Sequence, residues 1–220
     1  ILYTVLTVPV GMCISLLLAV MLDQKIAFRR FYRAAFFLPS ITSMVVVAIV
    51  WQWIYNPDYG LLNYFLSLFG IKGPKWLLDA NTSLLSLAIV GIWKRAGYDM
   101  IIFLSGLQGI SNSYYEASML DGANKWQQFR YITLPMLKPT TFFVFVMAVI
   151  SSFQVFDQVM LMTKGGPGRS SSVLVHYLYQ NAFQYFKLGY ACAIAYLLFF
   201  IVMGVTVFNM RMEKSMREIY

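Results

Sequence analysis

Five apolar stretches of bilayer-spanning length constrain the fold of this chain more than any other feature of its sequence. About 20 consecutive apolar residues are enough for a helix to cross the hydrocarbon core of a membrane. Prolines and glycines inside such stretches are tolerated, because neighbouring helices satisfy the backbone groups that they free. The sequence therefore predicts an all-α, polytopic membrane helix bundle with five spans, at residues 2–22, 34–55, 84–107, 142–162 and 188–210.

The composition also favours a membrane protein. Hydrophobic residues make up 60% of the chain and charged residues only 12%, whereas a water-soluble domain is nearer one quarter charged. The net charge of +8 would suggest nucleic acid in a soluble chain, but basic cytoplasmic loops explain it better in a membrane protein. We therefore expect a lipid bilayer as the partner and no nucleic acid. Cys13 and Cys192 lie inside apolar runs, so we expect buried thiols and no disulfide.

The chain begins at Ile1, already inside the first apolar run and without an initiator Met. Residues 1–22 lack the basic start of a signal peptide. We therefore expect an N-terminally truncated sequence, whose natural N-terminus precedes Ile1.

The basic residues outside the spans predict the orientation of the chain. Ten of them fall on one side of the five predicted crossings: Lys25, Arg29, Arg30, Arg33, Lys125, Arg130, Lys138, Arg211, Lys214 and Arg217. Five fall on the other side: Lys72, Lys75, Lys164, Arg169 and Lys187. Cytoplasmic loops carry the excess of Lys and Arg, so the first set is expected inside the cell.

A polar segment between the third and fourth stretches is predicted to form a helix-turn-helix on the cytoplasmic side. A helical pattern over residues 114–120 meets a turn signal at Asp121-Gly122, and an amphipathic pattern over residues 124–134 ends at Pro135. Ser113-x-x-Glu116 has the spacing of a capping box. We call residues 110–136 the finger. Its helices are too short to be stable alone in water, so we expect a partner groove to bury Tyr115, Met119 and Ala123.

The finger closely resembles the "EAA" loop of binding-protein-dependent ABC importer permeases. The matching residues are Glu116, Ala117, Asp121, Gly122, Ala123, Phe129, Ile132, Leu134 and Pro135. Ser118 stands where the family usually has a second alanine. The resemblance implies a coupling helix that docks in a groove of a cytoplasmic ATPase subunit, through Glu116, Ala117, Met119, Asp121, Gly122 and Ala123. Glu116 could cap the helix or meet a basic residue of the ATPase, and its charge does not decide between them.

Shorter patterns resemble the carbohydrate-transporting branch of that family. They are Arg29-x-x-Tyr32-Arg33, Phe37-Leu38-Pro39, Trp93-Lys94 with Gly97 and Tyr98, Gly106-Leu107-Gln108, and Phe156-Asp157-Gln158 through Thr163-Lys164-Gly165-Gly166-Pro167. The resemblance covers nearly the whole chain after about residue 25. It implies a type I ABC importer transmembrane domain, with residues 1–220 as a single permease domain in a bacterial or archaeal cytoplasmic membrane.

The same resemblance implies the partners of the chain. They are a second, similar permease that forms a heterodimer with it, a cytoplasmic ATPase dimer and an external solute-binding protein. No phosphate-binding G-x-x-x-x-G-K-[ST] loop occurs in the sequence, so we expect no cofactor on this chain and ATP-Mg on the partner ATPase. We find no catalytic or metal-binding constellation, and expect His176 to be an ordinary outer-loop residue.

Polar residues inside the spans are the candidates for a solute path, because such groups are costly in lipid and face a cavity or another helix. They are Lys94, Tyr98, Ser151, Gln154, Asp157 and Gln158. Helix–helix hydrogen bonds are the alternative for the two glutamines, and an ion pair is the alternative for Arg95 and Asp99, which are four residues apart. If Lys94 and Arg95 both face the path, the solute could be an anionic sugar.

The sequence thus favours a permease subunit that imports a sugar or oligosaccharide by alternating access. A permease for amino acids, peptides or ions is the first alternative, and only the pattern over residues 156–167 argues against it. An intramembrane enzyme and a passive channel are alternatives from other classes. Residues 61–69 are apolar but short, and we expect an interfacial helix there.

Overall fold

The computed structural model describes residues 1–24 and 26–217, with side chains described as far as Phe208, and all secondary-structure elements in this part of the chain are helices. Lys25 and the side chains of Arg211, Lys214 and Arg217, which the orientation argument uses, lie outside the described residues. The helices are α1 (Leu2–Asp23), α2 (Arg29–Ile41), α3 (Met44–Ile54), α4 (Leu61–Leu68), α5 (Ser83–Gln108), α6 (Asn112–Leu120), α7 (Lys125–Gln128), α8 (Leu134–Met136), α9 (Lys138–Phe153), α10 (Asp157–Met162), α11 (Leu174–Tyr179) and α12 (Leu188–Arg217), with π-helical segments Phe129–Thr133 and Gln180–Gln184.

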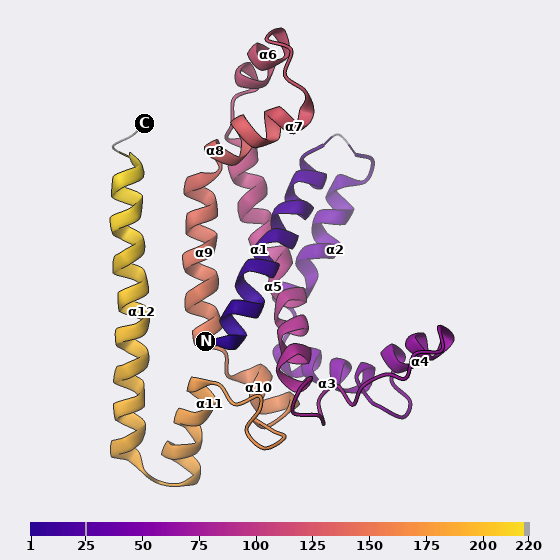
Figure 1. Ribbon diagram of the computed structural model, residues 1–220, viewed down its shortest axis with the longest axis vertical. Coiled ribbons are helices and arrows are strands. Elements are labelled where there is room, and N and C mark those ends of the chain that lie inside the picture. Colours follow the sequence, from indigo (N-terminus) through magenta and orange to yellow (C-terminus); the bar gives the residue numbers. More distant parts are fainter. Residues whose placement is uncertain (25, 218–220) are drawn as a thin grey trace.

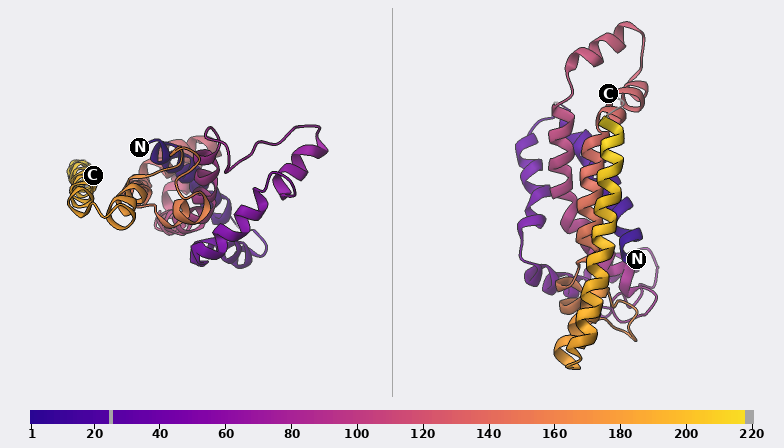
Figure 2. Two further views of the ribbon diagram at one scale, coloured as in Figure 1. Left: turned by 90° about the horizontal axis from the view of Figure 1, so that it is seen from below. Right: turned by 90° about the vertical axis from the view of Figure 1, so that its left-hand side faces the viewer.

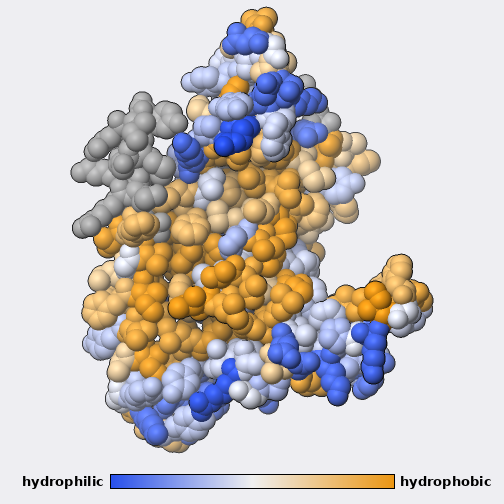
Figure 3. Space-filling view, viewed as in Figure 1, coloured by the Kyte–Doolittle hydropathy of each residue, from blue (hydrophilic) through white to orange (hydrophobic). Residues whose placement is uncertain are grey.

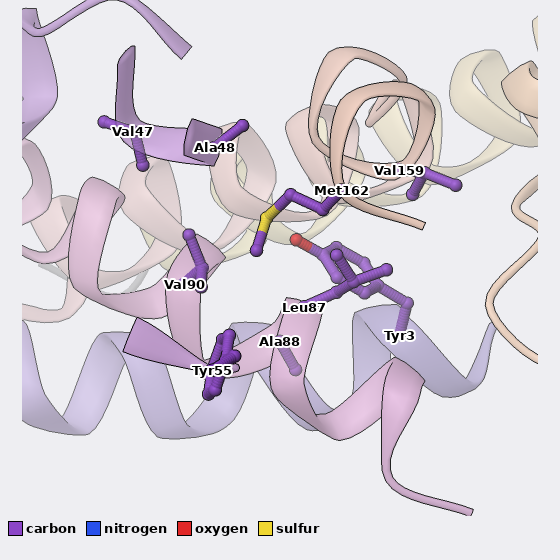
Figure 4. Close-up of a cluster of buried hydrophobic side chains, with 9 residues drawn as sticks. All are labelled: Tyr3, Val47, Ala48, Tyr55, Leu87, Ala88, Val90, Val159 and Met162. Atoms are coloured by element: carbon purple, nitrogen blue, oxygen red, sulfur yellow. The ribbon is translucent and has the colours of Figure 1, made fainter. Parts of the chain in front are cut away.

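The long helices form an upright bundle. Helix α1 packs along α5 and α9, α2 packs on α5, and α12 lies against α9 at one edge (Figures 1 and 2). Two groups of buried apolar residues hold the bundle together. One joins α1, α3, α5 and α10 through residues such as Tyr3, Leu87 and Val159 (Figure 4). The other joins α1, α5 and α9 near the finger, around Phe103 and Val144.

The surface of the bundle matches a lipid bilayer. Apolar side chains cover its middle, and hydrophilic residues gather at the finger and at the opposite end (Figure 3). By length and composition, α1 and α12 could each cross a membrane, and two bent helix pairs raise the number of candidate spans to four. Helix α5 has 26 residues, or about 39 Å of helix, but it carries Lys94, Arg95 and Asp99. Five crossings therefore stay a prediction, with α5 as the fifth.

The second predicted span is not a straight helix. It breaks after Ile41, and α2 and α3 meet at 98°. The last carbonyl groups of α2 have no partner within the helix. The Lys94 ammonium group on α5 donates hydrogen bonds to three carbonyl oxygens there, those of Pro39 (3.1 Å), Ser40 (3.3 Å) and Thr42 (2.6 Å). Lys94 on α5 thus supplies hydrogen bonds to the carbonyl groups that the bend leaves without helical partners.

The fourth predicted span is also interrupted. Helix α9 ends at Phe153, residues 154–156 are not helical, and α10 begins at Asp157. The pattern predicted to end at Pro135 continues for one more residue: residues 125–136 are helical through α7, the π-helical segment and α8, and end at Met136. A change of direction of 64° follows between residues 125–136 and α9.

Cys13 and Cys192 are free and exposed, which corrects the expectation of buried thiols. The reason is that an apolar span buries only one side against its neighbours and leaves the other side for lipid. We therefore expect both thiols to face the bilayer.

The finger and the loop between α10 and α11 lie at opposite ends of the bundle (Figure 1). We predict that the finger is cytoplasmic and the loop external, as the basic residues indicate. Single cysteines at Gly122 and Gly166, on a background without Cys13 and Cys192, test this in intact cells. An impermeant maleimide should label position 166 at once and position 122 only after lysis. Exposed Arg169 of the same loop offers a second external site. The reverse labelling pattern would overturn the orientation.

Candidate functional site

The finger begins and turns through local hydrogen bonds. The Ser111 hydroxyl accepts a bond from the Ser113 N–H group (3.3 Å) and caps α6, so the capping box expected at Ser113 and Glu116 is wrong. A complete capping box occurs instead at Asn124 and Gln127, whose side chains each accept from the other's backbone N–H at 2.9 and 2.8 Å. The N-x-x-Q pattern was the signal for it in the sequence.

Gly122 forms the turn between the two helices of the finger. Its φ is +79°, a conformation that costs glycine least. A Cβ atom at this position would meet no other atom of the described chain within 4 Å. The backbone conformation of the turn therefore accounts for a glycine at position 122. The space beside Gly122 is open to a partner.

Ser118 joins the two helices of the finger. The Gln128 amide donates to the Ser118 hydroxyl (3.0 Å), which in turn donates to the Tyr115 carbonyl (2.8 Å). The serine that departs from the family's alanine thus has a structural role in this chain. The Tyr115 hydroxyl bonds Thr133 (3.0 Å), and its ring packs on the apolar cluster near the finger. Tyr115 is therefore used within the chain, contrary to the expectation that a partner would bury it.

The finger exposes apolar side chains outside the apolar belt, the apolar surface around the middle of the bundle (Figure 3). Leu120 is 90% exposed, Trp126 70% and Met119 58%. We call these three residues the finger patch. Glu116, Ala117, Asp121 and Gly122 are also exposed, and Ala123 is half-buried. Exposed apolar groups clustered on a protrusion are typical of a protein interface. The sequence reasoning missed Leu120, which directly precedes the Asp121-Gly122 turn signal, and gave no contact role to Trp126, which lies four residues after it.

A pocket of about 390 Å³ opens within the bundle, between α1, α5, α9, α10 and the bend after α2. All six sequence-predicted path residues line it: Lys94, Tyr98, Ser151, Gln154, Asp157 and Gln158. The prediction from their polarity therefore brought together residues of two predicted spans that lie more than 50 positions apart in the sequence. Ser151, Gln154, Asp157 and Tyr98 are exposed there, so their polar groups can meet a solute.

Two of the six residues are already engaged by the chain itself. Lys94 donates to the three carbonyl groups at the α2–α3 bend. Gln158 is only 5% exposed. Its amide donates to the Leu87 carbonyl, and its oxygen accepts a bond from the Tyr3 hydroxyl (3.2 Å). This is the helix–helix hydrogen bonding that the sequence left open for the glutamines.

Arg95 and Asp99 form the expected ion pair, with Arg95 Nε 2.8 Å from Asp99 Oδ2. The Asp99 side chain is 2% exposed and that of Arg95 28% exposed. The Arg95 guanidinium also lies 5.9 Å from the centre of the Tyr98 ring. Asp99 Oδ1 and Arg95 Nη2 are buried without a hydrogen bond in the described part of the protein. The pair neutralises both charges on the pocket wall.

Helix α1 contributes a wall that the sequence analysis missed. Tyr3 and Thr7, four residues apart, line the pocket, and Thr4 accepts a bond from Ser152 on α9 (2.9 Å). Polar residues at this spacing on an otherwise apolar span were the available signal.

The loop after α10, residues 163–172, is tightly held at the end opposite the finger. The Ser171 hydroxyl contacts Thr163 Oγ1 (2.8 Å) and the Gly166 carbonyl (2.7 Å). His176 is 1% exposed and packs beneath Gly165, where a Cβ would collide with its ring. Burial lowers the pKa of the His176 imidazole. His176 is thus a buried packing residue, which corrects the expectation of an ordinary outer-loop residue, and hydrogen bonds within the loop join Ser171 to residues 163 and 166.

An apolar belt, a polar pocket inside it and a protruding finger define a membrane permease. Residues 11–213 match the family described as the binding-protein-dependent transport system inner membrane component. The chain therefore belongs to this family: it is the permease component of an ABC importer in the inner membrane, and is not itself the ATPase.

Relatives extend over most of the chain. It is 37% identical to the ABC transporter permease protein YurN of Bacillus subtilis, with 99% of this chain and 76% of YurN covered. It is 32% identical to AraP of the same organism, a permease protein of an arabinooligosaccharide transport system, with 98% and 69% covered. A solved bacterial ABC transporter involved in the import of the acidic polysaccharide alginate superimposes with a TM-score of 0.88 at 25% identity, over 97% of this chain and 76% of that one. That transporter is also solved in complex with an alginate pentasaccharide-bound periplasmic protein.

Proposed function

We propose that this chain forms part of the translocation path for a sugar or oligosaccharide. The observation that carries the proposal is the pocket wall formed by Ser151, Gln154, Asp157 and Tyr98, which gathers hydroxyl, amide and carboxylate groups inside an apolar bundle. Such groups offer donors and acceptors to a hydroxyl-rich solute. The oligosaccharide named for AraP and the polysaccharide named for the alginate transporter support the same solute class.

The charges in the pocket favour a neutral sugar. The Lys94 ammonium group is bonded to three carbonyl oxygens and Arg95 is paired with Asp99. Neither cation is left over for an anionic group of the solute, while Asp157 adds an exposed carboxylate. An anionic sugar would have to separate an ion pair or the bonds at the α2–α3 bend.

The finger is proposed to couple this path to ATP hydrolysis. In this account a cytoplasmic ATPase dimer, which holds ATP-Mg, receives Glu116, Ala117, Met119, Asp121, Gly122 and Ala123, with the finger patch at the contact. The path lies between this chain and a second, similar permease. An external binding protein delivers the solute at the opposite end, in the cytoplasmic membrane of a bacterium or archaeon. Closure of the ATPase dimer moves the fingers together and turns the pocket outward.

The two glutamines of the pocket allow a matched test of the path. Gln154→Leu removes an exposed amide, so the solute concentration for half-maximal uptake should rise about tenfold, the equivalent of one hydrogen bond of about 1.4 kcal/mol. The reconstituted complex should assemble normally. Gln158→Leu makes the same chemical change but leaves the Tyr3 hydroxyl and the Leu87 carbonyl unpaired. It should cost about 1–3 kcal/mol of stability and leave the half-maximal concentration unchanged.

The readouts are uptake at a fixed concentration of binding protein and thermal unfolding of the purified complex. An unchanged half-maximal concentration in Gln154→Leu, together with a loss of stability like that of Gln158→Leu, would show that both glutamines only join helices.

A further inference from the structure

Helix α4 leaves the bundle sideways, at the end opposite the finger (Figures 1 and 2). Its neighbour is α3, and beyond α4 the chain folds back through residues 71–76. A helix of eight residues is too short to be stable alone in water. One side of α4 is held within the chain: the Asn63 amide donates to the Pro57 carbonyl (3.1 Å), and the Asn63 carbonyl oxygen accepts from Trp76 Nε1 (2.7 Å). These bonds tie the Asn63 side of α4 to the segments that flank it.

The other side of α4 is an uncovered apolar stripe. Its residues follow each other by three and four positions and share one face: Leu61, Tyr64, Phe65 and Leu68 are 42%, 60%, 56% and 62% exposed. Phe69 and Ile71 continue the apolar surface with 78% and 55% exposure. Water does not favour such a stripe, so something apolar must cover it.

The direction of the stripe indicates what covers it. The hydrophobic surface of the α4 arm lies on the side toward the level of the transmembrane helices, and the hydrophilic surface lies on the side away from them (Figure 3). The arm stands at the margin of the apolar belt, so its apolar side continues the surface that faces lipid. Lys72 and Lys75, both exposed, follow α4 and can pair with phosphate groups of lipids.

We propose that α4 is an in-plane membrane anchor, whose apolar stripe lies among the acyl chains of the outer leaflet while its polar side faces water and headgroups. An amphipathic helix with aromatic residues on its apolar side is suited to this position. The anchor follows the C-terminal end of α3. The N-terminal end of α3 adjoins the bend beside the pocket, where Lys94 donates hydrogen bonds to the carbonyl groups. The anchor thereby fixes one wall of the pocket relative to the membrane surface.

Spin labels on α4 test the anchor. The assembled transporter, on a background without Cys13 and Cys192, is placed in nanodiscs of phosphatidylcholine and phosphatidylglycerol. One label is carried by Leu68→Cys on the stripe and a matched one by Ser67→Cys, the adjacent exposed residue off the stripe. Leu197→Cys on α12, which is 52% exposed, is the reference for lipid. The measurement is collision of each label with oxygen, which enters lipid, and with a water-soluble nickel chelate.

The ratio of oxygen to nickel collisions at position 68 should exceed that at position 67 several-fold and approach that at position 197. Equal ratios at 67 and 68, both far below that at position 197, would place the stripe in water. An immobile label at 68 that neither reagent reaches would mean that a protein, such as a second permease, covers the stripe. Either result overturns the anchor. Phe65→Cys, on the same stripe, replaces Leu68→Cys if that complex does not assemble.

Discussion

Gly122→Asp is expected to abolish the response of ATP hydrolysis to solute and binding protein, and with it uptake, while the complex still assembles in the membrane. Aspartate tolerates positive φ better than most residues, and the space beside Gly122 is open within the chain. The substitution therefore disturbs the isolated permease little. Its side chain and charge would enter the space that the ATPase groove is proposed to occupy, next to the finger patch. We expect at least a tenfold loss of solute-stimulated hydrolysis.

Two further variants separate the causes of this loss. Gly122→Asn adds nearly the same volume without charge, so a similar loss would assign the effect to size. Glu116→Gln keeps the shape of an exposed side chain and removes its charge, which tests an ionic contact with the ATPase alone. The measurement is ATPase activity of the purified complex in lipid, with and without solute-loaded binding protein. Normal stimulation in the Gly122→Asp complex would refute the role of the finger in coupling.

Asp99→Ala is expected to destabilise the protein strongly. The Asp99 carboxylate is 2% exposed and pairs with Arg95 at 2.8 Å. Removing one member of a buried pair leaves the other charge uncompensated and typically costs about 3–5 kcal/mol. For a chain of this size that corresponds to a fall of about 6–20 °C in melting temperature. Thermal unfolding of the purified complex in lipid measures the fall.

The double variant Arg95→Met with Asp99→Val distinguishes a structural pair from a solute contact. Replacing both charges by apolar side chains close to them in volume is often neutral, so most of the lost stability should return. If Arg95 and Asp99 only compensate each other's charge, the double variant imports solute with an unchanged half-maximal concentration. A double variant that is stable but needs far more solute would mean that Arg95 or Asp99 contacts the solute, against our assignment of the pair.

The sequence predicted those features that depend on long or fixed patterns. The first span, residues 2–22, coincides with α1 within one residue, because a long apolar run specifies a membrane helix by itself. The turn at Gly122 was equally predictable, since positive φ and the Asp-Gly signal agree. The polar residues Ser151, Gln154, Asp157 and Gln158 line the pocket as their polarity predicted, although the break over residues 154–156 means that one continuous helical stripe does not place them there.

Other features depend on contacts between distant residues, and the sequence could not reveal them. The carbonyl groups at the bend between α2 and α3 accept hydrogen bonds from Lys94, which lies more than 50 positions further along the sequence. Gln154 and Gln158 have the same side chain and lie four positions apart, yet only Gln158 accepts a hydrogen bond from the Tyr3 hydroxyl on α1. The role of Ser118 likewise depends on Gln128, which only the folded finger brings within reach.

The most direct test of the account is ATP-driven uptake by the whole transporter reconstituted in proteoliposomes with its ATPase and external binding protein. A panel of labelled solutes would include neutral oligosaccharides, acidic oligosaccharides, amino acids and short peptides. We expect a neutral sugar or oligosaccharide to accumulate inside the liposomes only when ATP and the binding protein are both present, and we expect Gly122→Asp to stop this accumulation. Accumulation of an amino acid or peptide instead, or sugar flux that needs no ATP, would contradict the account.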